Sequence, residues 1–191
     1  MKETGDVADR QIAFVVDATR CINCKTCEIA CKDIKAAPVG VRLRKVRTFE
    51  AGEFPAVFVS NISMSCNHCE DPLCARHCPA SAYEKRSDGI VVHHSERCIG
   101  CRYCTWTCPY GAPQFDAAEG RIRKCDLCAD ELDIGKQPAC VLACPTRAIT
   151  LGSLDEATRD PNLTNDLVNV PQPGLTKPAT RYRVRKEARN G

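Results

Sequence analysis

The sequence lacks the features that mark several common classes of protein. Its 191 residues contain no apolar run near the roughly 18–20 residues that a membrane helix needs, and the longest spans residues 12–16. Residues 1–10 are polar, with neither an apolar core nor a twin-arginine pair, so we expect no secretion signal here. The chain has 27 Lys and Arg residues and 24 Asp and Glu residues, which give a formal net charge of +3. This small excess of positive charge does not indicate nucleic-acid binding.

Nucleotide and haem motifs are missing as well. There is no G-x-G-x-x-G sequence and no phosphate-binding loop, which argues against nicotinamide, flavin and ATP sites. No C-x-x-C-H sequence indicates an attached haem, and the C-x3-C-x2-C spacing of radical-SAM enzymes does not occur. No nucleophile and base can be paired from the remaining residues. We therefore expect a chain that is not catalytic by itself.

Cysteine, in contrast, is abundant. The 16 cysteines are about one residue in twelve, a proportion expected of small disulfide scaffolds. They fall into four groups of four, which are Cys21, Cys24, Cys27 and Cys31; Cys66, Cys69, Cys74 and Cys78; Cys98, Cys101, Cys104 and Cys108; and Cys125, Cys128, Cys140 and Cys144. The first and third groups share the spacing C-x2-C-x2-C-x3-C, and the last cysteine of every group except the first precedes proline.

Three chemistries compete for these cysteines. Disulfides are disfavoured because Cys21, Cys24 and Cys27 would each have to pair elsewhere, and no export signal points to an oxidising compartment. Zinc sites usually combine two separated C-x2-C pairs. The observed run is instead the spacing of bacterial ferredoxins, in which three thiolates bind one cubane and the fourth binds another. Sixteen cysteines at four per cubane predict four 4Fe–4S clusters.

The clusters also change the charge of the chain. Each oxidised cubane with four thiolates carries about −2, so a chain loaded with four clusters carries about −5. We therefore interpret the surplus of Lys and Arg as partial compensation for buried cluster charge.

The pattern along the chain predicts an α+β fold of short hairpins and helices. Residues 21–27 and 98–104 form an internal repeat with an offset of 77. The expected strands are Ile12–Asp17, Tyr83–Lys85, Ile90–His93, Pro113–Phe115, Arg121–Lys124 and Ala148–Leu151, and the expected helices are Glu28–Asp33 and Ala129–Ile134. Because this unit has a small apolar core, we expect little stable fold without its clusters.

Three regions follow from this interpretation. Residues 1–11 form a polar N-terminal extension, residues 12–155 a four-cluster ferredoxin-like domain, and residues 156–191 an extended tail. The tail is rich in proline and ends in a basic stretch, so it is either disordered or an arm that binds a partner subunit. The alternating segment Arg42–Arg47 is either an amphipathic edge strand or a docking surface.

Four other residues could tune the clusters. Lys25 and Arg102 occupy matched positions in the repeat, and a cation near a cluster stabilises its reduced form. His68 lies between cluster cysteines and is either a hydrogen-bonding or packing residue or a tuning one. Trp106, between Cys104 and Cys108, either packs against a cluster or contributes to the electron path.

These motifs together resemble a known family. The chain is similar to the four-cluster iron–sulfur subunits of molybdopterin oxidoreductases, and most of all to those of the anaerobic dimethyl sulfoxide reductases. The segments that carry the resemblance are Cys21–Lys32, Ser65–Pro72, Cys98–Cys104, Cys108–Gln114 and Lys124–Asp126. The resemblance covers about residues 12–155.

The resemblance implies two nested dicluster modules, a pairing that spacing alone does not distinguish from a sequential one. Group one would exchange its fourth cysteine with group four, and group two with group three. The implied ligand sets are set one, Cys21, Cys24, Cys27 and Cys144; set two, Cys31, Cys125, Cys128 and Cys140; set three, Cys66, Cys69, Cys74 and Cys108; and set four, Cys78, Cys98, Cys101 and Cys104.

The resemblance also implies function and partners. It indicates an electron-transfer subunit that relays electrons between a molybdopterin catalytic subunit and either a quinone-linked membrane subunit or a soluble donor. Such a protein stays in the cytoplasm or crosses the membrane folded with a partner that bears a twin-arginine signal. The alternatives are the corresponding subunit of a hydrogenase or formate dehydrogenase complex and, from another class, a zinc-stabilised interaction module.

Overall fold

The computed structural model describes residues 11–189, so most of the expected N-terminal extension, residues 1–11, lies outside the described residues. The strands are β1 Ile12–Asp17, β2 Lys45–Ala51, β3 Phe58–Met64, β4 Tyr83–Lys85, β5 Val91–His93, β6 Gln114–Asp116, β7 Arg121–Arg123, β8 Ile149–Ser153 and β9 Arg181–Arg183. The α-helices are α1 Thr26–Ile34, α2 Leu73–Arg76, α3 Tyr103–Thr107, α4 Ala129–Asp133, α5 Ala139–Leu142 and α6 Leu154–Arg159. Short 3₁₀ turns are η2 Ser95–Arg97, η3 Pro173–Leu175 and η4 Lys186–Ala188. This mixture of short helices and strands agrees with the expected α+β class.

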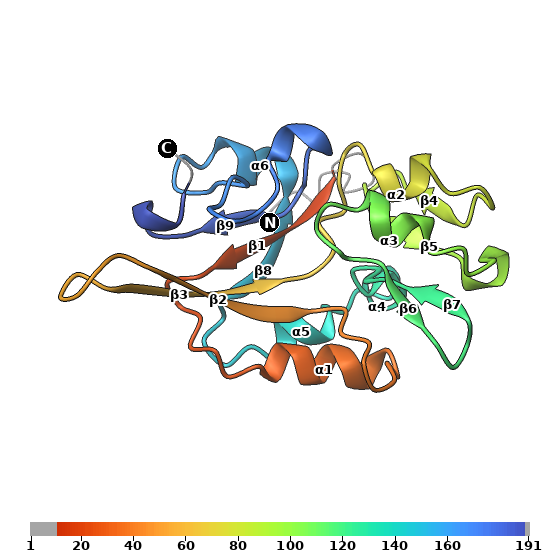
Figure 1. Cartoon of the computed structure of the whole chain (residues 1–191), viewed down its shortest axis with the longest axis horizontal. Helices are drawn as coiled ribbons and strands as arrows, with labels where there is room; N and C mark the ends of the chain where they lie inside the picture. Colours follow the sequence, from red (N-terminus) through yellow and green to blue (C-terminus); the bar gives the residue numbers. More distant parts are fainter. Residues whose placement is uncertain (1–10, 190–191) are drawn as a thin grey trace, which may run out of the picture.

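Strand β1 is the centre of a three-stranded sheet with the order β8-β1-β9 (Figure 1). It pairs antiparallel with β8 and parallel with β9, so that Val15 lies opposite both Thr150 and Arg181. Phe14 and Val16 are almost fully buried in the main core. The apolar run 12–16 lies within this strand, and the adjacent residues Ala13 and Phe14, which point to opposite faces, are both buried, which explains why the run is continuous.

Two small hairpins, β4–β5 and β6–β7, lie beside this sheet together with α2 and α3 (Figure 1). Both hairpins were expected from the sequence. The turn between β4 and β5 contains Gly89, whose positive φ of 80° favours glycine. A second, smaller core of Cys74, Val91, Cys104 and Ile122 holds this half of the molecule together.

The hairpin β2–β3 is the longest pairing in the described part of the chain, with Lys45 opposite Met64 and Ala51 opposite Phe58. It projects beyond the sheet on the left of Figure 1. Of residues 42–47, only 45–47 lie in a strand, because β2 begins at Lys45, and within the described residues β2 pairs only with β3. A docking role for the segment stays a prediction. The full hairpin was not expected from the sequence.

The C-terminal region packs in part against the cluster domain. Residues 176–183 return to the cluster domain, where β9 joins the main sheet and Tyr182 is only 3% exposed. The same segment also holds the loop of the second cysteine group, since Ala179 donates its N–H to the Asn67 carbonyl at 3.0 Å. The stretch from 156 onward is thus not separate from the domain at 12–155. Its binding to a partner stays a prediction.

Replacing Tyr182 with Ala should therefore destabilise the cluster domain itself. The change removes a buried ring and its hydroxyl contact with Asn67, and large-to-small changes of buried aromatic side chains cost about 3–5 kcal/mol of unfolding free energy. Thermal unfolding of the loaded protein measures the effect. The matched control is Arg183→Ala, which breaks only a partly exposed ion pair with Asp160 and should cost about 1 kcal/mol or less. Equal melting temperatures for the Tyr182 variant and the wild type would contradict this role.

Candidate iron–sulfur sites

Three cavities in the structure are each lined by four cysteines. One is lined by Cys66, Cys69, Cys74 and Cys108. Another is lined by Cys78, Cys98, Cys101 and Cys104. A third is lined by Cys31, Cys125, Cys128 and Cys140. In each cavity, three cysteines come from one group and the fourth comes from a different group.

The four remaining cysteines also influence one another. Burial raises the pKa of the Cys21 thiol, and the nearby Cys144 and Cys24 raise it further. Burial likewise raises the pKa of the Cys27 thiol, and Cys140 and Cys21 add to this effect, while Ser63 and Arg44 oppose it. Cys144 is therefore close to Cys21 although the two are far apart in the sequence.

The Cys-Pro sequences form one recurring turn. After Cys78 and Cys144, the residue four positions later donates its backbone N–H to the cysteine sulfur, from Ala82 at 3.3 Å and from Ala148 at 3.2 Å. The third Cys-Pro turn provides the same kind of backbone hydrogen bond, from Ala112 to Cys108. Backbone N–H groups aimed at a ligand sulfur stabilise the thiolate form that iron requires.

The two halves of the internal repeat share a backbone conformation as well as a spacing. Lys25 and Arg102 precede α1 and α3 with φ values of 61° and 62°, in the left-handed region. Gly100 has a φ of 68°, and a Cβ placed there would lie 2.2 Å from the carbonyl oxygen of Gly120. Gly100 of the third cysteine group corresponds to Asn23 of the first. The close approach of the Gly120 carbonyl leaves no room for a side chain at position 100, which explains the glycine there.

Burial makes most of these thiols poor acids in the absence of a metal. It raises the pKa of Cys31, Cys69 and Cys74 to about 12, and the neighbouring cysteines add to the shift. Metal binding requires thiolates, so cluster assembly must release protons and must offset negative charge inside the protein. Two fully buried cations, Arg44 and Lys124, lie among the cysteines and supply part of that compensation.

Lys124 lies between ligand sets two and three. Its Nζ is 3.4 Å from Cys66 Sγ and donates hydrogen bonds to the carbonyl oxygens of Val91 at 2.5 Å and Cys125 at 2.6 Å. His68 links the same two sets, because its backbone N–H lies 3.5 Å from Cys66 Sγ and its Nε2 lies 3.9 Å from Cys125 Sγ.

The contact made by Nδ1, the other ring nitrogen of His68, determines which nitrogen of the ring carries the proton. Nδ1 accepts the backbone N–H of Val91 at 3.1 Å. Burial, followed by the charges of Lys124 and Arg44, holds the pKa of His68 well below its ordinary value. The ring is therefore neutral with its proton on Nε2, directed toward Cys125. His68 is placed to act on a cluster ligand, and whether it tunes a potential stays a prediction.

Several buried polar atoms near the cysteines have no partner within the described residues. They include Nε and Nη2 of Arg44 and Nε2 of His93. Tyr83 and His93 line the cavity of set four, and the hydroxyl of Tyr83 is directed toward Cys104. Buried polar groups normally find a hydrogen-bond partner, and a cubane places acceptor sulfurs at such positions. The donor atoms and cavities therefore fit 4Fe–4S clusters. Within residues 11–189, no three or more His, Cys, Asp or Glu side chains are arranged to hold a single metal ion.

The remaining tuning candidates lie at the surface. Trp106 is 82% exposed, and its packing against a cluster and its part in the electron path both stay predictions. Arg102 stacks its guanidinium on the ring of Phe115 at 3.6 Å, beside the cavity of set four. Lys25 is the N-cap residue of α1, and its side chain makes no capping hydrogen bond. A tuning role for Lys25, Arg102 and Trp106 stays a prediction.

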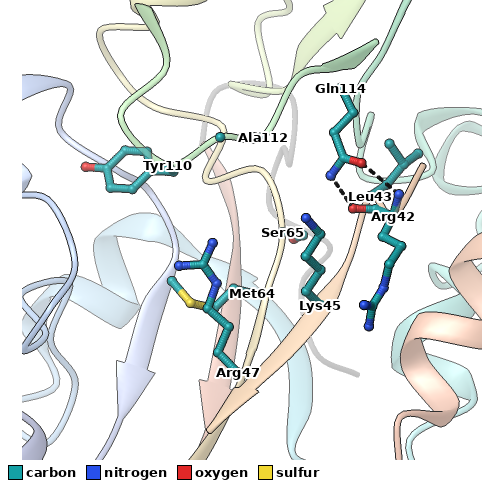
Figure 2. Close-up of a pocket in the computed structure, with 10 residues that line it drawn as sticks. Arg42, Leu43, Lys45, Arg47, Met64, Ser65, Tyr110, Ala112 and Gln114 are labelled. Carbon is teal, nitrogen blue, oxygen red and sulfur yellow. Dashed lines mark hydrogen bonds between the residues drawn. The ribbon is translucent and has the colours of Figure 1, made fainter. Parts of the chain in front are cut away.

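A shallow basic pocket lies outside the cysteine cavities, and Figure 2 shows the side chains that line it. Arg42 precedes β2, Lys45 and Arg47 lie at its start, and Tyr110 and Gln114 face them from the other side. Gln114 and Arg42 exchange two hydrogen bonds, drawn as dashed lines in Figure 2. The buried cation Arg44 of the same segment points away from this pocket, into the core.

The sequence is similar to known proteins over most of its length. Residues 57–154 match the model of the 4Fe-4S dicluster domain. The iron–sulfur component of the anaerobic dimethyl sulfoxide reductase of Escherichia coli is 43% identical over 176 residues, which are 88% of this chain and 86% of that protein. The chain belongs to the family of iron–sulfur subunits that includes this reductase component.

Other members of this iron–sulfur subunit family serve different oxidoreductases. The corresponding sulfite dehydrogenase subunit of Allochromatium vinosum is 35% identical, over 94% of this chain and 85% of that protein. The formate dehydrogenase iron–sulfur subunit of Wolinella succinogenes is 36% identical, over 76% of this chain and 82% of that protein. As a member of the family, the chain is an electron-transfer subunit that carries 4Fe–4S clusters and is not itself catalytic. Its sixteen cysteines match four clusters. No helix within residues 11–189 is long and apolar enough to span a bilayer.

Proposed function

We propose that the chain relays single electrons along four clusters held by ligand sets one to four, arranged in that order as two nested modules within residues 12–155. The observation that carries this proposal is that three cavities are each lined by four cysteines drawn from two groups. The four cysteines in each of these cavities are the same as those of ligand sets three, four and two, which the family resemblance implies.

The proposed order is supported by side chains at each junction between sets. Arg44 interacts with Cys27 of set one and with Cys140 of set two. Lys124 interacts with Cys125 of set two and Cys66 of set three. Tyr83 interacts with Cys104 of set four and Cys74 of set three. Since one side chain at each junction feels the charge of cysteines from both neighbouring sets, an electron would pass between neighbouring sites through a short stretch of packed protein.

The chain's own residues would set the energy of each step. A 4Fe–4S cluster supplies a one-electron store whose potential depends on hydrogen bonds to sulfur, local charge and solvent exposure, over about −700 to +450 mV in proteins. Here the Cys-Pro turns donate backbone N–H groups to sulfur, while Arg44 and Lys124 supply buried positive charge. The exposed cysteines Cys24 and Cys101 belong to sets one and four, at opposite ends of the proposed row.

The proposed partner is a molybdopterin catalytic subunit, with either a quinone-linked membrane subunit or a soluble donor at the other end. This follows from the family resemblance, and the reaction takes place on the partner. The formate dehydrogenase relative favours a formate dehydrogenase complex as the second candidate. We propose either a cytoplasmic location or export together with a partner that bears a twin-arginine signal.

Anaerobic purification of the complex from its native source tests this function. We expect about sixteen irons per chain with acid-labile sulfide, electron paramagnetic resonance (EPR) signals of reduced 4Fe–4S clusters, and a large molybdopterin subunit that co-purifies. The clusters should change oxidation state when the substrate of that large subunit is added: a reductase substrate should reoxidise reduced clusters, and formate should reduce oxidised ones. Zinc without sulfide would instead support an interaction module and would end the cluster interpretation.

A further inference from the structure

Arg44 is a buried cation with an incomplete set of contacts. Its side chain is 2% exposed, and its guanidinium lies over the ring of Phe14 at 4.4 Å. One nitrogen, Nη1, donates a hydrogen bond to Ser63 Oγ at 3.1 Å. That hydroxyl in turn lies 3.4 Å from Cys27 Sγ, so the contact connects Arg44 to ligand set one.

The other two guanidinium nitrogens have no partner. Nε and Nη2 are inaccessible to solvent and make no hydrogen bond within the described residues. No carboxylate within residues 11–189 forms an ion pair with Arg44, in contrast to the exposed Arg42 of the same segment, which pairs with Glu28. A buried guanidinium without an anion or acceptors is unfavourable, so these donors indicate a missing acceptor.

The neighbours of Arg44 identify that acceptor by its chemistry. Burial disfavours its charged form, but Cys140, Cys125, Cys27 and Cys31 outweigh this effect and favour the cation. Three of these four cysteines belong to ligand set two, and Phe14, over whose ring the guanidinium lies, lines the cavity of that set. The fourth, Cys27, belongs to set one. The acceptor that this environment would hold is anionic and rich in sulfur. Lys124 differs in this respect, because its Nζ already has a sulfur and two carbonyl oxygens as partners.

We propose that Arg44 is a positioning residue shared by two clusters, which donates Nε–H and Nη2–H to sulfur of the set-two cluster and acts on the set-one cluster through Ser63. This inference rests on the proposed function. A reduced cluster carries one more negative charge than an oxidised one, so a permanent buried cation at its sulfurs stabilises the reduced form. The electron comes from the proposed partner, and Arg44 neither gains nor loses a proton.

Redox titration of the full complex, followed by EPR, tests the inference. In the Arg44→Met variant, the equilibrium constant for reduction of the set-two cluster should fall at least about tenfold, which is about 59 mV for a one-electron couple. The set-one potential should fall less, and those of sets three and four should stay unchanged. The matched control is Arg47→Met, a cation of the same segment that is exposed in the basic pocket of Figure 2.

A second measurement keeps the inference testable if Arg44→Met fails to assemble. Wild-type protein labelled with ¹⁵N in its arginine side chains should show a hyperfine coupling between guanidinium nitrogen and the reduced set-two cluster. The coupling should disappear in Arg44→Lys, which keeps the charge without the forked donors. Absence of the coupling in the wild type, or unchanged potentials in a loaded Arg44→Met protein, would overturn the inference. A wild-type complex without any 4Fe–4S signal would instead reject the proposed function.

Discussion

Anaerobic removal of iron with a chelator should abolish the cooperative fold of the chain. Six cysteines, namely Cys27, Cys31, Cys66, Cys125, Cys140 and Cys144, are members of the main buried core. Without clusters, the cavities beside them lose their contents and the buried cations lose their counter-charges. We expect most of the tertiary circular dichroism signal and the thermal transition to disappear, because metal binding and folding are coupled in such domains.

The control for this experiment is reconstitution. Iron and sulfide added back under anaerobic conditions should restore both the transition and the brown colour, whereas magnesium should not. An unchanged transition after complete loss of iron would mean that side-chain packing alone stabilises the fold, and our account of the core would be wrong.

Replacing Cys144 with Ser should perturb the same cluster as replacing Cys21, despite their distance in the sequence. The two thiols interact in the structure, and the Cys144 sulfur accepts the backbone N–H of Ala148. Each variant should lose or convert one cluster, with a loss of up to about four irons, and should change one EPR signal. Redox titration of each variant identifies which signal has changed.

A matched pair of variants serves as the control. Cys31→Ser and Cys125→Ser should change a second signal, shared by those two and distinct from the first. If Cys31→Ser altered the signal that Cys21→Ser alters, the groups would not exchange their fourth cysteines, and the proposed ligand sets would be wrong. This outcome would leave the number of clusters unaffected.

Much of the local structure could be predicted from the sequence. The hairpins β4–β5 and β6–β7 and the helices α1 and α4 occur where periodicity and turn residues indicate them. These elements depend mainly on neighbouring residues, such as Gly89 in its turn and Gly135 after α4, both with positive φ.

The β2–β3 hairpin and the return of the C-terminal segment could not be predicted in this way. The hairpin encloses residues 52–57 between strands that mix polar and apolar residues, so no clear alternation indicates a buried face. The parallel pairing of β9 with β1 joins residues that are more than a hundred positions apart, and no local signal reports such a contact. Proline and basic residues in this region suggested either a disordered tail or an arm that binds a partner subunit, whereas Tyr182 and several neighbours are buried within the chain itself.

The cofactor chemistry can be read from the sequence, because the number and spacing of the cysteines indicate how many thiolates each loop can provide for a cubane. The side chains that surround those thiolates are known only from the folded chain. Arg42, Arg44 and Arg47 look equivalent in the sequence, yet Arg44 alone among them is buried beside four cysteines. Its orientation depends on strand pairing and on Phe14 and Ser63, which come from other strands. Long-range packing therefore places Arg44, and not Arg42 or Arg47, beside the proposed cluster sites. Composition and periodicity do not distinguish these three residues.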